Sequence, residues 1–193
     1  LDVLPLEDSK ELLMQIAPRI GDKAEGMAKL CGCLPIALRN AAYALAEHKD
    51  LDVAEYLKKM EDATNRVELV EASFSLSYDI LSSNQKKIWS MLSVFPVDFD
   101  QVGAAVVCGE DYTVTALNDL LKLSLLDFNS EGKRYRLHDL ARDFAFYKLE
   151  NNPKEEVQQR HAEYYYKVLS EANKMYNQGN DSVLYGLKLF DME

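Results

Sequence analysis

The sequence has few of the residues on which disulfide scaffolds and metal sites depend. Its 193 residues include only three cysteines and three histidines. An odd number of cysteines, with no Cys-x-x-Cys pair, argues against a disulfide framework and indicates buried thiols in a reducing compartment. His48, His138 and His161 show no zinc-ligand spacing. We therefore expect no disulfide, no metal ligand and a cytoplasmic location.

The sequence also lacks long hydrophobic runs and a surplus of basic residues. No segment approaches the roughly 20 apolar residues of a membrane span. Acidic residues number 32 against 22 basic ones, which gives a formal net charge of −10. This charge disfavours nucleic acids and anionic membranes as partners, because both attract clustered Lys and Arg. The start at Leu1 lacks the basic n-region of a signal peptide, and we expect the chain to be a fragment of a longer protein.

Motifs of common catalytic sites are missing as well. The chain contains no Gly-x-x-x-x-Gly-Lys-[Ser/Thr] phosphate loop. No Ser or Cys stands in the sequence context of an activated nucleophile. We therefore expect no catalytic residue in this chain and no enzyme activity of the chain alone.

Apolar residues at helical spacing are abundant in the first third of the chain. A capping box at Asp8-Ser9-Lys10-Glu11 predicts a helix that ends at Gly21. A second helix follows, Pro35 suits the first turn of a third, and a fourth begins near Asp52. Residues 1–66 are therefore predicted to form a helical subdomain.

The pattern changes between residues 67 and 150. Helices are expected after a cap at Ser83, after Asp100 and over Thr113–Lys122. A short strand before a polar turn and the alternating Arg134–Leu137 segment then indicate a β-hairpin. Helices followed by such a hairpin, closed by one more helix, are typical of a winged-helix domain.

Residues 151–193 again show helical periodicity and are predicted to lead into a repeat or sensor region. Tyr164-Tyr165-Tyr166 spans more than one helix face, so some of these rings must contact a neighbour or solvent. The predicted fold class is mainly α, with a helical subdomain, a winged helix with one β-hairpin, and further helices.

A winged helix most often binds DNA, but the charges here do not favour that use. Between Asn84 and Glu150 there are 8 basic and 10 acidic residues, a net charge of −2. The helix that would enter the major groove, Thr113–Lys122, contains no Arg. A DNA-binding transcription regulator is therefore kept as one alternative, and a scaffold for protein–protein contacts as another.

Several short segments stand in a recognisable order. They are Cys31–Leu38, Leu76–Leu81, Leu92–Pro96, Leu123–Leu126 and Leu137–Asp139. Over about residues 1–150 they resemble the NB-ARC family of STAND signalling nucleotide switches, which includes apoptotic regulators and plant disease-resistance proteins. The first resembles the family's Gly-Leu-Pro-Leu motif with Cys33 in place of Gly, and the last its Met-His-Asp motif with Leu137 in place of Met.

The resemblance implies the regulatory half of an ADP/ATP-controlled switch. Pro35 and Leu34 would pack against the base and ribose, and His138 would hydrogen-bond the β-phosphate of ADP as a latch. Asp139 is expected to cap the helix that follows. ADP or ATP is expected to bind only together with an upstream phosphate-loop domain, which would make the whole protein a slow ATPase. A downstream repeat or sensor domain is the other implied partner, with oligomerisation on activation.

Overall fold

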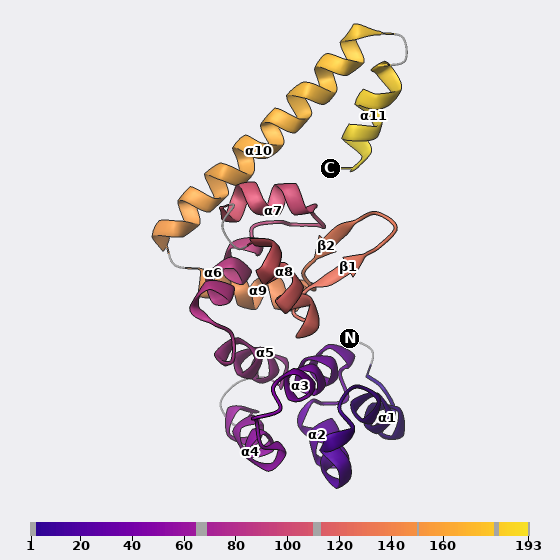
Figure 1. Cartoon of the computed structure of the whole chain (residues 1–193), viewed down its shortest axis with the longest axis vertical. Coiled ribbons are helices and arrows are strands. Elements are labelled where there is room, and N and C mark those ends of the chain that lie inside the picture. Colours follow the sequence, from indigo (N-terminus) through magenta and orange to yellow (C-terminus); the bar gives the residue numbers. More distant parts are fainter. Residues whose placement is uncertain (1–2, 65–68, 110–112, 150, 180–181, 193) are drawn as a thin grey trace.

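The computed structural model describes residues 3–64, 69–109, 113–149, 151–179 and 182–192. A helical unit lies at one end of an elongated molecule, a winged-helix unit lies in the middle, and a pair of helices projects from the other end (Figure 1). One two-stranded antiparallel hairpin stands among helices. The prediction of a mainly α fold with one β-hairpin is confirmed.

The helical unit surrounds a core rich in alanine. Its elements are α1 (Leu6–Ile16), η1 (Pro18–Lys23), α2 (Ala24–Leu30), α3 (Pro35–Glu47) and α4 (Val53–Thr64). Helix α3 packs on α1 and is buried along most of its length. The buried side chains Leu13, Met27, Leu38, Leu45 and Met60 fill the space between the helices.

Two details of α1 differ from the prediction. The helix begins at Leu6 behind Pro5, and Ser9 lies inside it, where its hydroxyl donates to the Pro5 carbonyl at 2.9 Å. The predicted capping box is therefore wrong. The helix also ends at Ile16 rather than before Gly21, because the ring of Pro18 disfavours a helical conformation at Ala17.

The winged-helix unit follows. Its elements are α5 (Leu69–Asp79), α6 (Ser83–Leu92), α7 (Gln101–Cys108), α8 (Thr113–Lys122), β1 (Asp127–Asn129), β2 (Arg134–Arg136) and α9 (Asp139–Lys148). Phe128 pairs with Tyr135 in the antiparallel hairpin. Backbone bonds of 2.7 and 2.8 Å between Tyr135 and Phe99 tie the wing to the segment before α7. The wing is therefore anchored to the body of the unit.

Capping residues explain two of these helix starts. Asp100 accepts the Gly103 N–H at 2.6 Å and begins α7, as predicted. The cap of α6 is Ser82, not Ser83, because Ser82 forms a capping box with Gln85. The prediction chose the wrong one of two neighbouring serines.

Helix α5 contributes to two cores. Its Ala72 is buried in the helical unit, whereas its Phe74 is buried in the winged-helix unit. It packs on α3 and α4 on one side and on α9 on the other. The predicted boundary at residue 66 lies outside the described residues.

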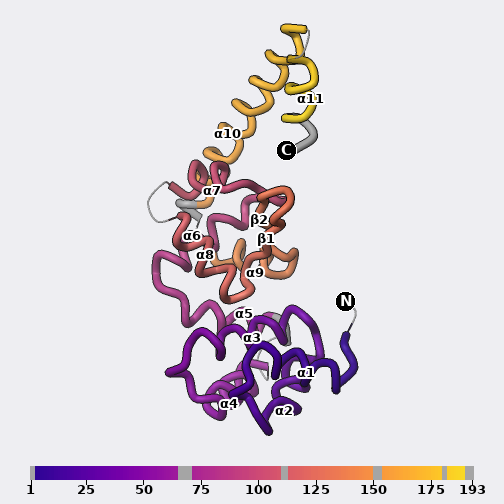
Figure 2. The backbone as a smooth tube through the Cα atoms, turned by 45° about the vertical axis from the view of Figure 1, so that its right-hand side comes forward, coloured from indigo at the N-terminus to yellow at the C-terminus, as the bar shows by residue number. Residues whose placement is uncertain are grey.

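Helices α10 (Asn151–Gln178) and α11 (Ser182–Met192) form an antiparallel pair that extends away from the winged helix (Figures 1 and 2). A Cβ at Gly186 would lie 2.7 Å from the Ala172 carbonyl oxygen, so the two helices approach closely there. The base of α10 packs on α7, where Tyr165 meets Phe95 while Tyr166 is 74% exposed. None of the described helices is long and apolar enough to cross a membrane.

Candidate functional site: the His138 pocket

His138 is the N-cap of α9. Its backbone is extended at φ −59° and ψ 142°, and the Leu140 N–H donates to its Nδ1 at 3.3 Å. Asp139 was predicted to cap this helix, and that prediction is wrong. Asp139 lies in the first turn, where its carboxylate is 3.4 Å from Arg142 and 3.9 Å from Arg136.

This cap has a chemical consequence for the imidazole. A nitrogen that accepts a hydrogen bond carries no proton, so the neutral ring holds its proton on Nε2. The ring is half-buried and lines an open pocket. Nε2–H is thus available as a hydrogen-bond donor, while Nδ1 holds the start of the helix.

The turn between α2 and α3 positions Leu34 and Pro35. Gly32 and Cys33 both have positive φ, 59° and 54°, which turns the chain sharply after α2. Leu34 is then the extended N-cap of α3, and Pro35 occupies the first helical position, where its missing N–H costs nothing. The Cys33 carbonyl accepts the Leu4 N–H at 2.9 Å and so ties the N-terminal segment to the turn.

The backbone of Cys33 has a conformation that glycine adopts more readily. A side chain in the left-handed region costs about 1–2 kcal/mol, which Gly avoids. Cys33 adopts this region with φ 54° and therefore carries a small strain. The substitution leaves the turn intact.

The three residues predicted for the site come together in one pocket. Leu34, Pro35 and His138 line a cavity of about 170 Å³, although about 100 residues separate the turn from the histidine. The other lining side chains are Ile36, Arg39, Ser124 and Asp127. The start of α3 contributes the apolar side chains, whereas the winged-helix unit contributes the imidazole of His138 and the carboxylate of Asp127.

Sequence reasoning missed the charged pair at this pocket. Arg39 lies 3.1 Å from Asp127 and links α3 to β1, with both side chains about half exposed. Arg39 follows Pro35 by four residues and thus shares its helix face, a signal that could have found it. Nothing in the sequence indicates its pairing with a residue 88 positions away.

The electrostatics of the pocket favour an anion on one side. Backbone N–H groups of the first turn of α3 lack helical partners, and the helix dipole adds partial positive charge there. Arg39 contributes a full charge, which Asp127 partly balances. An anion that displaced the carboxylate of Asp127 would meet the guanidinium group and the Nε2–H of His138.

Two of the three thiols are buried and unreactive. Burial raises the pKa of Cys31 and of Cys108 to about 12, so neither forms a reactive thiolate near neutral pH. Among the residues that the structure describes, no three His, Cys, Asp or Glu side chains are grouped so as to hold a metal ion.

Comparisons with known proteins set this geometry in context. No family model matches the chain. The chain is 32% identical over 161 residues to the regulatory protein AfsR of Streptomyces coelicolor, covering 75% of this chain and 16% of that protein. It is 26% identical over 156 residues to a Mycobacterium tuberculosis protein named as an HTH-type transcriptional regulator, covering 72% of this chain and 18% of that one.

A solved structure shares the fold over almost the whole chain. It is a STAND protein (signal transduction ATPase with numerous domains) with a tetratricopeptide repeat sensor, from Pyrococcus horikoshii. The TM-score is 0.61 at 18% identity, covering 97% of this chain and 24% of that one. The chain therefore shares the fold of the matched part of that STAND protein. It spans less than a fifth of the curated regulators that it matches, at 16% and 18% of their lengths.

Proposed function

We propose that this chain is the helical and winged-helix part of an ADP/ATP-controlled signalling switch of the NB-ARC type. The STAND-type fold and the similarity to regulatory proteins support a signalling role. The observation that supports nucleotide binding is the pocket that Leu34, Pro35 and His138 line together. The phosphate loop of the switch would belong to another domain of the same protein.

The size of the pocket supports a half-site. At about 170 Å³ it is smaller than the roughly 300–1,000 Å³ typical of sites that enclose a small molecule. A nucleotide would therefore need a second wall from the phosphate-loop domain. This chain alone is proposed to bind ADP very weakly, and isothermal titration that gave micromolar affinity would contradict the proposal.

Within the switch, His138 would act as the latch. Its Nε2–H would donate to a phosphate oxygen of ADP, while Leu34 and Pro35 would pack against the base and ribose. A hydrogen bond to a charged group contributes about 1.5–3 kcal/mol. That free energy biases a closed and an open state by roughly tenfold to a hundredfold. No residue of this chain is assigned to hydrolysis, which would be a slow activity of the whole protein.

The test separates the latch from the helix cap. In the full-length protein, His138→Ala removes both the Nε2–H donor and the Nδ1 acceptor. His138→Asn keeps a side-chain oxygen that can cap α9 but leaves no donor at the position of Nε2. Release of a fluorescent ADP analogue should become about tenfold to a hundredfold faster in both variants, and unchanged in the control His48→Ala. A change in His138→Ala alone would assign the residue to the cap and sink the latch.

A transcription regulator that binds DNA is the second candidate, favoured by the name of the mycobacterial relative. The exposed face of α8 offers Thr115 and Asn118, but its Lys122 pairs with Asp119 at 3.3 Å. Duplex binding with a steep salt dependence would support this candidate over the switch.

The exposed apolar residues of the last two helices support a downstream repeat or sensor domain as a partner. Tyr176, Leu184 and Tyr185 are 50–66% exposed on the α10–α11 pair. We propose that following helices of the same protein cover them, as stacked helical repeats do. Hydrogen exchange at α11 should slow in a chain extended past residue 193.

A further inference from the structure

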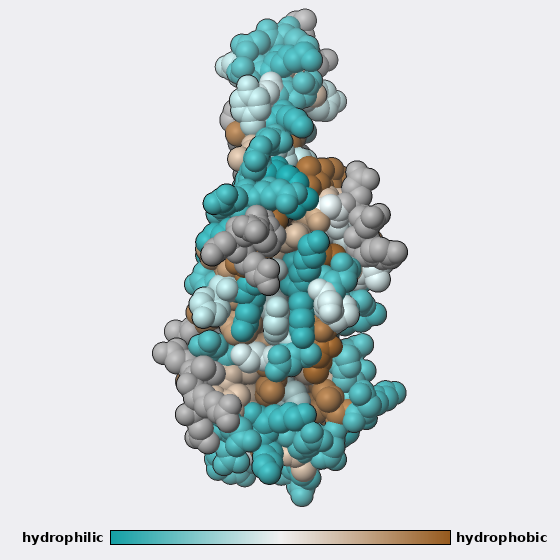
Figure 3. All heavy atoms as spheres, turned by 90° about the vertical axis from the view of Figure 1, so that its left-hand side faces the viewer, coloured by the Kyte–Doolittle hydropathy of each residue, from teal (hydrophilic) through white to brown (hydrophobic). Residues whose placement is uncertain are grey.

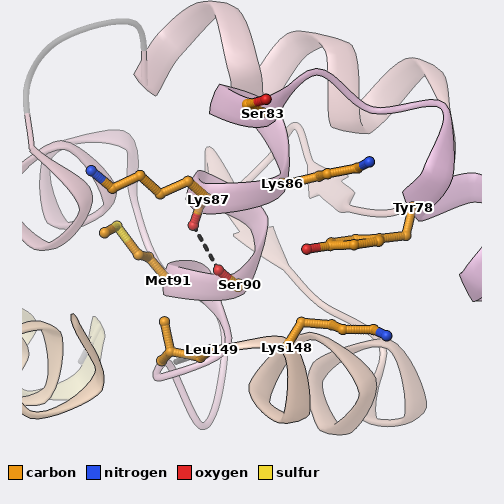
Figure 4. Close-up of a pocket in the computed structure, with 8 residues that line it drawn as sticks. All are labelled: Tyr78, Ser83, Lys86, Lys87, Ser90, Met91, Lys148 and Leu149. Atoms are coloured by element: carbon orange, nitrogen blue, oxygen red, sulfur yellow. Dashed lines mark hydrogen bonds between the residues drawn. The ribbon is translucent and has the colours of Figure 1, made fainter. Parts of the chain in front are cut away.

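A second pocket lies on the winged-helix unit, apart from the His138 pocket. It opens between α6, the end of α5 and the end of α9, and it encloses about 350 Å³ (Figure 4). Its lining includes Tyr78, Lys86, Lys87, Ser90 and Lys148. It shares no residue with the pocket of His138.

The charge at this pocket is opposite to that of the molecule. Lys86, Lys87 and Lys148 line it, and none of the described lining residues is Asp or Glu, in a chain of net charge −10. The face in Figure 3 is predominantly hydrophilic, with hydrophobic residues surfacing only in small patches. A local cluster of positive charge in an acidic molecule attracts an anionic partner to that place, even though the net charge of the molecule repels it.

Two of the three ammonium groups, those of Lys86 and Lys148, contact aromatic rings or a carbonyl. Lys86 lies 5.0 Å from the ring centre of Tyr78 and donates to the Asp79 carbonyl at 3.2 Å. Lys148 lies 5.5 Å from the same ring and 4.9 Å from that of Phe144. Figure 4 shows the Tyr78 ring between these two lysines. Lys86 and Lys148 are thus positioned before a ligand arrives, and an anion would relieve the mutual repulsion of the lysines.

The remaining lining selects among anions. Ser90 donates its hydroxyl to the Lys87 carbonyl at 2.8 Å, so its proton is already used (Figure 4). The ring of Tyr78 is flanked by lysines and offers no platform for a stacked base. Met91 and Leu149 supply an apolar floor. Three separate ammonium groups around this floor act as point charges, which match carboxylates spaced along a peptide.

We propose that this pocket binds an acidic segment of a partner protein. Carboxylates of the segment would pair with Lys86, Lys87 and Lys148, and one apolar side chain would lie on Met91 and Leu149. Attraction by the whole molecule cannot mimic this binding, because a chain of net charge −10 repels an acidic peptide.

The test is fluorescence anisotropy with the 193-residue chain and a labelled peptide of alternating Glu and Leu. A peptide with Gln for each Glu serves as the matched probe. The double variant Lys87→Gln/Lys148→Gln should weaken binding roughly tenfold. The control Lys58→Gln/Lys167→Gln changes the net charge equally at exposed positions elsewhere and should leave affinity unchanged. Circular dichroism checks that each variant is folded, and Lys87→Gln alone, which removes no ring contact, should weaken binding about threefold.

Three outcomes would overturn the proposal. One is the absence of saturable binding at low salt. A second is an equal loss of affinity in the control variant, which would show that the peptide does not bind to these particular lysines. A third is tighter binding of a 20-base-pair duplex than of the peptide, which would make the pocket a contact for nucleic-acid phosphates.

Discussion

The helical unit and the winged-helix unit have cores built from different side chains. Half of the buried residues in the core of the helical unit are alanines, and Tyr56 is its one buried aromatic residue among those described. The alanines are Ala17, Ala24, Ala28, Ala37, Ala41, Ala42, Ala44 and Ala72. The winged-helix core contains two groups of contacting rings, Phe74 with Trp89 and Phe144, and Phe95 with Phe99 and Tyr135.

The difference indicates how each unit resists change. Small side chains let helix axes approach closely, so a core of alanines has no room for added volume. Large rings fill the space between short helices and a two-stranded wing, so that core cannot lose volume without a cavity. The His138 pocket lies where residues from both units meet, and its geometry depends on both kinds of packing.

Loss of volume should harm the winged-helix unit most. Trp89 is fully buried and its indole N–H donates to the Leu125 carbonyl at 3.2 Å. Trp89→Ala should lower the free energy of unfolding by about 3–5 kcal/mol. Urea denaturation followed by circular dichroism measures it, and Tyr147→Ala, at a residue 82% exposed, should change it by less than about 0.5 kcal/mol. A similar loss in both variants would contradict the packing argument.

Added volume should harm the helical unit. Ala41 has no exposed surface, so Ala41→Leu should cost about 1–3 kcal/mol in the free energy of unfolding. The control is Ala54→Leu, at an exposed position of α4. If the two variants unfold at the same urea concentration, the helical core has more space than its alanines suggest.

Relief of backbone strain should give a smaller effect of opposite sign. Cys33→Gly removes the Cβ from a residue at φ 54° and should stabilise the helical unit by about 0.5–1 kcal/mol, after the extra freedom of Gly in the unfolded chain is subtracted. Cys33→Ala keeps the Cβ and should gain nothing. Thermal denaturation compares the two, and an equal gain would exclude strain as the cause.

The smallest effect concerns pH at the junction of α10 with the winged helix. His161 packs edge-on against Phe95 at 5.0 Å, and burial lowers its pKa below the ordinary 6.5. Its contribution to stability is therefore complete above pH 6.5 and declines as the pH falls from there through the lowered pKa of the folded state. His161→Phe should lose less melting temperature between pH 7.5 and pH 5.5 than the unmodified chain. Equal losses would show that this histidine does not link pH to stability.

Much of the fold follows from periodicity and local signals. The helices around Pro35 and Asp100 and the wing at Arg134–Arg136 lie where the sequence predicts them. The choice between Ser82 and Ser83 depended on Gln85. The Gln85 side chain completes a capping box with the serine three residues before it, and that serine is Ser82. The sharing of α5 between two cores depends on tertiary packing, which no local pattern encodes.

The site could be predicted in part. Motif resemblance identified Leu34, Pro35 and His138, and the structure places them in one pocket, while their roles toward a nucleotide stay predictions. Arg39 and Asp127 escaped because their pairing is made by the fold alone. The lysine pocket escaped for the same reason, since Lys148 joins Lys86 and Lys87 only when α9 packs on α6.

The length of α10 turns a local event into a distant one. With 28 residues it spans roughly 42 Å at 1.5 Å per residue, and among the described residues its first half, from Val157 to Tyr165, packs on the winged-helix unit. Beyond Tyr164, which lies against Gly103 of α7, the helix continues for 14 residues or roughly 21 Å, so a tilt of about 5° at α7 would move its far end by roughly 2 Å. The two helices that meet closely at Gly186 would thus act as a lever, whose far end moves further than its contact with the winged helix.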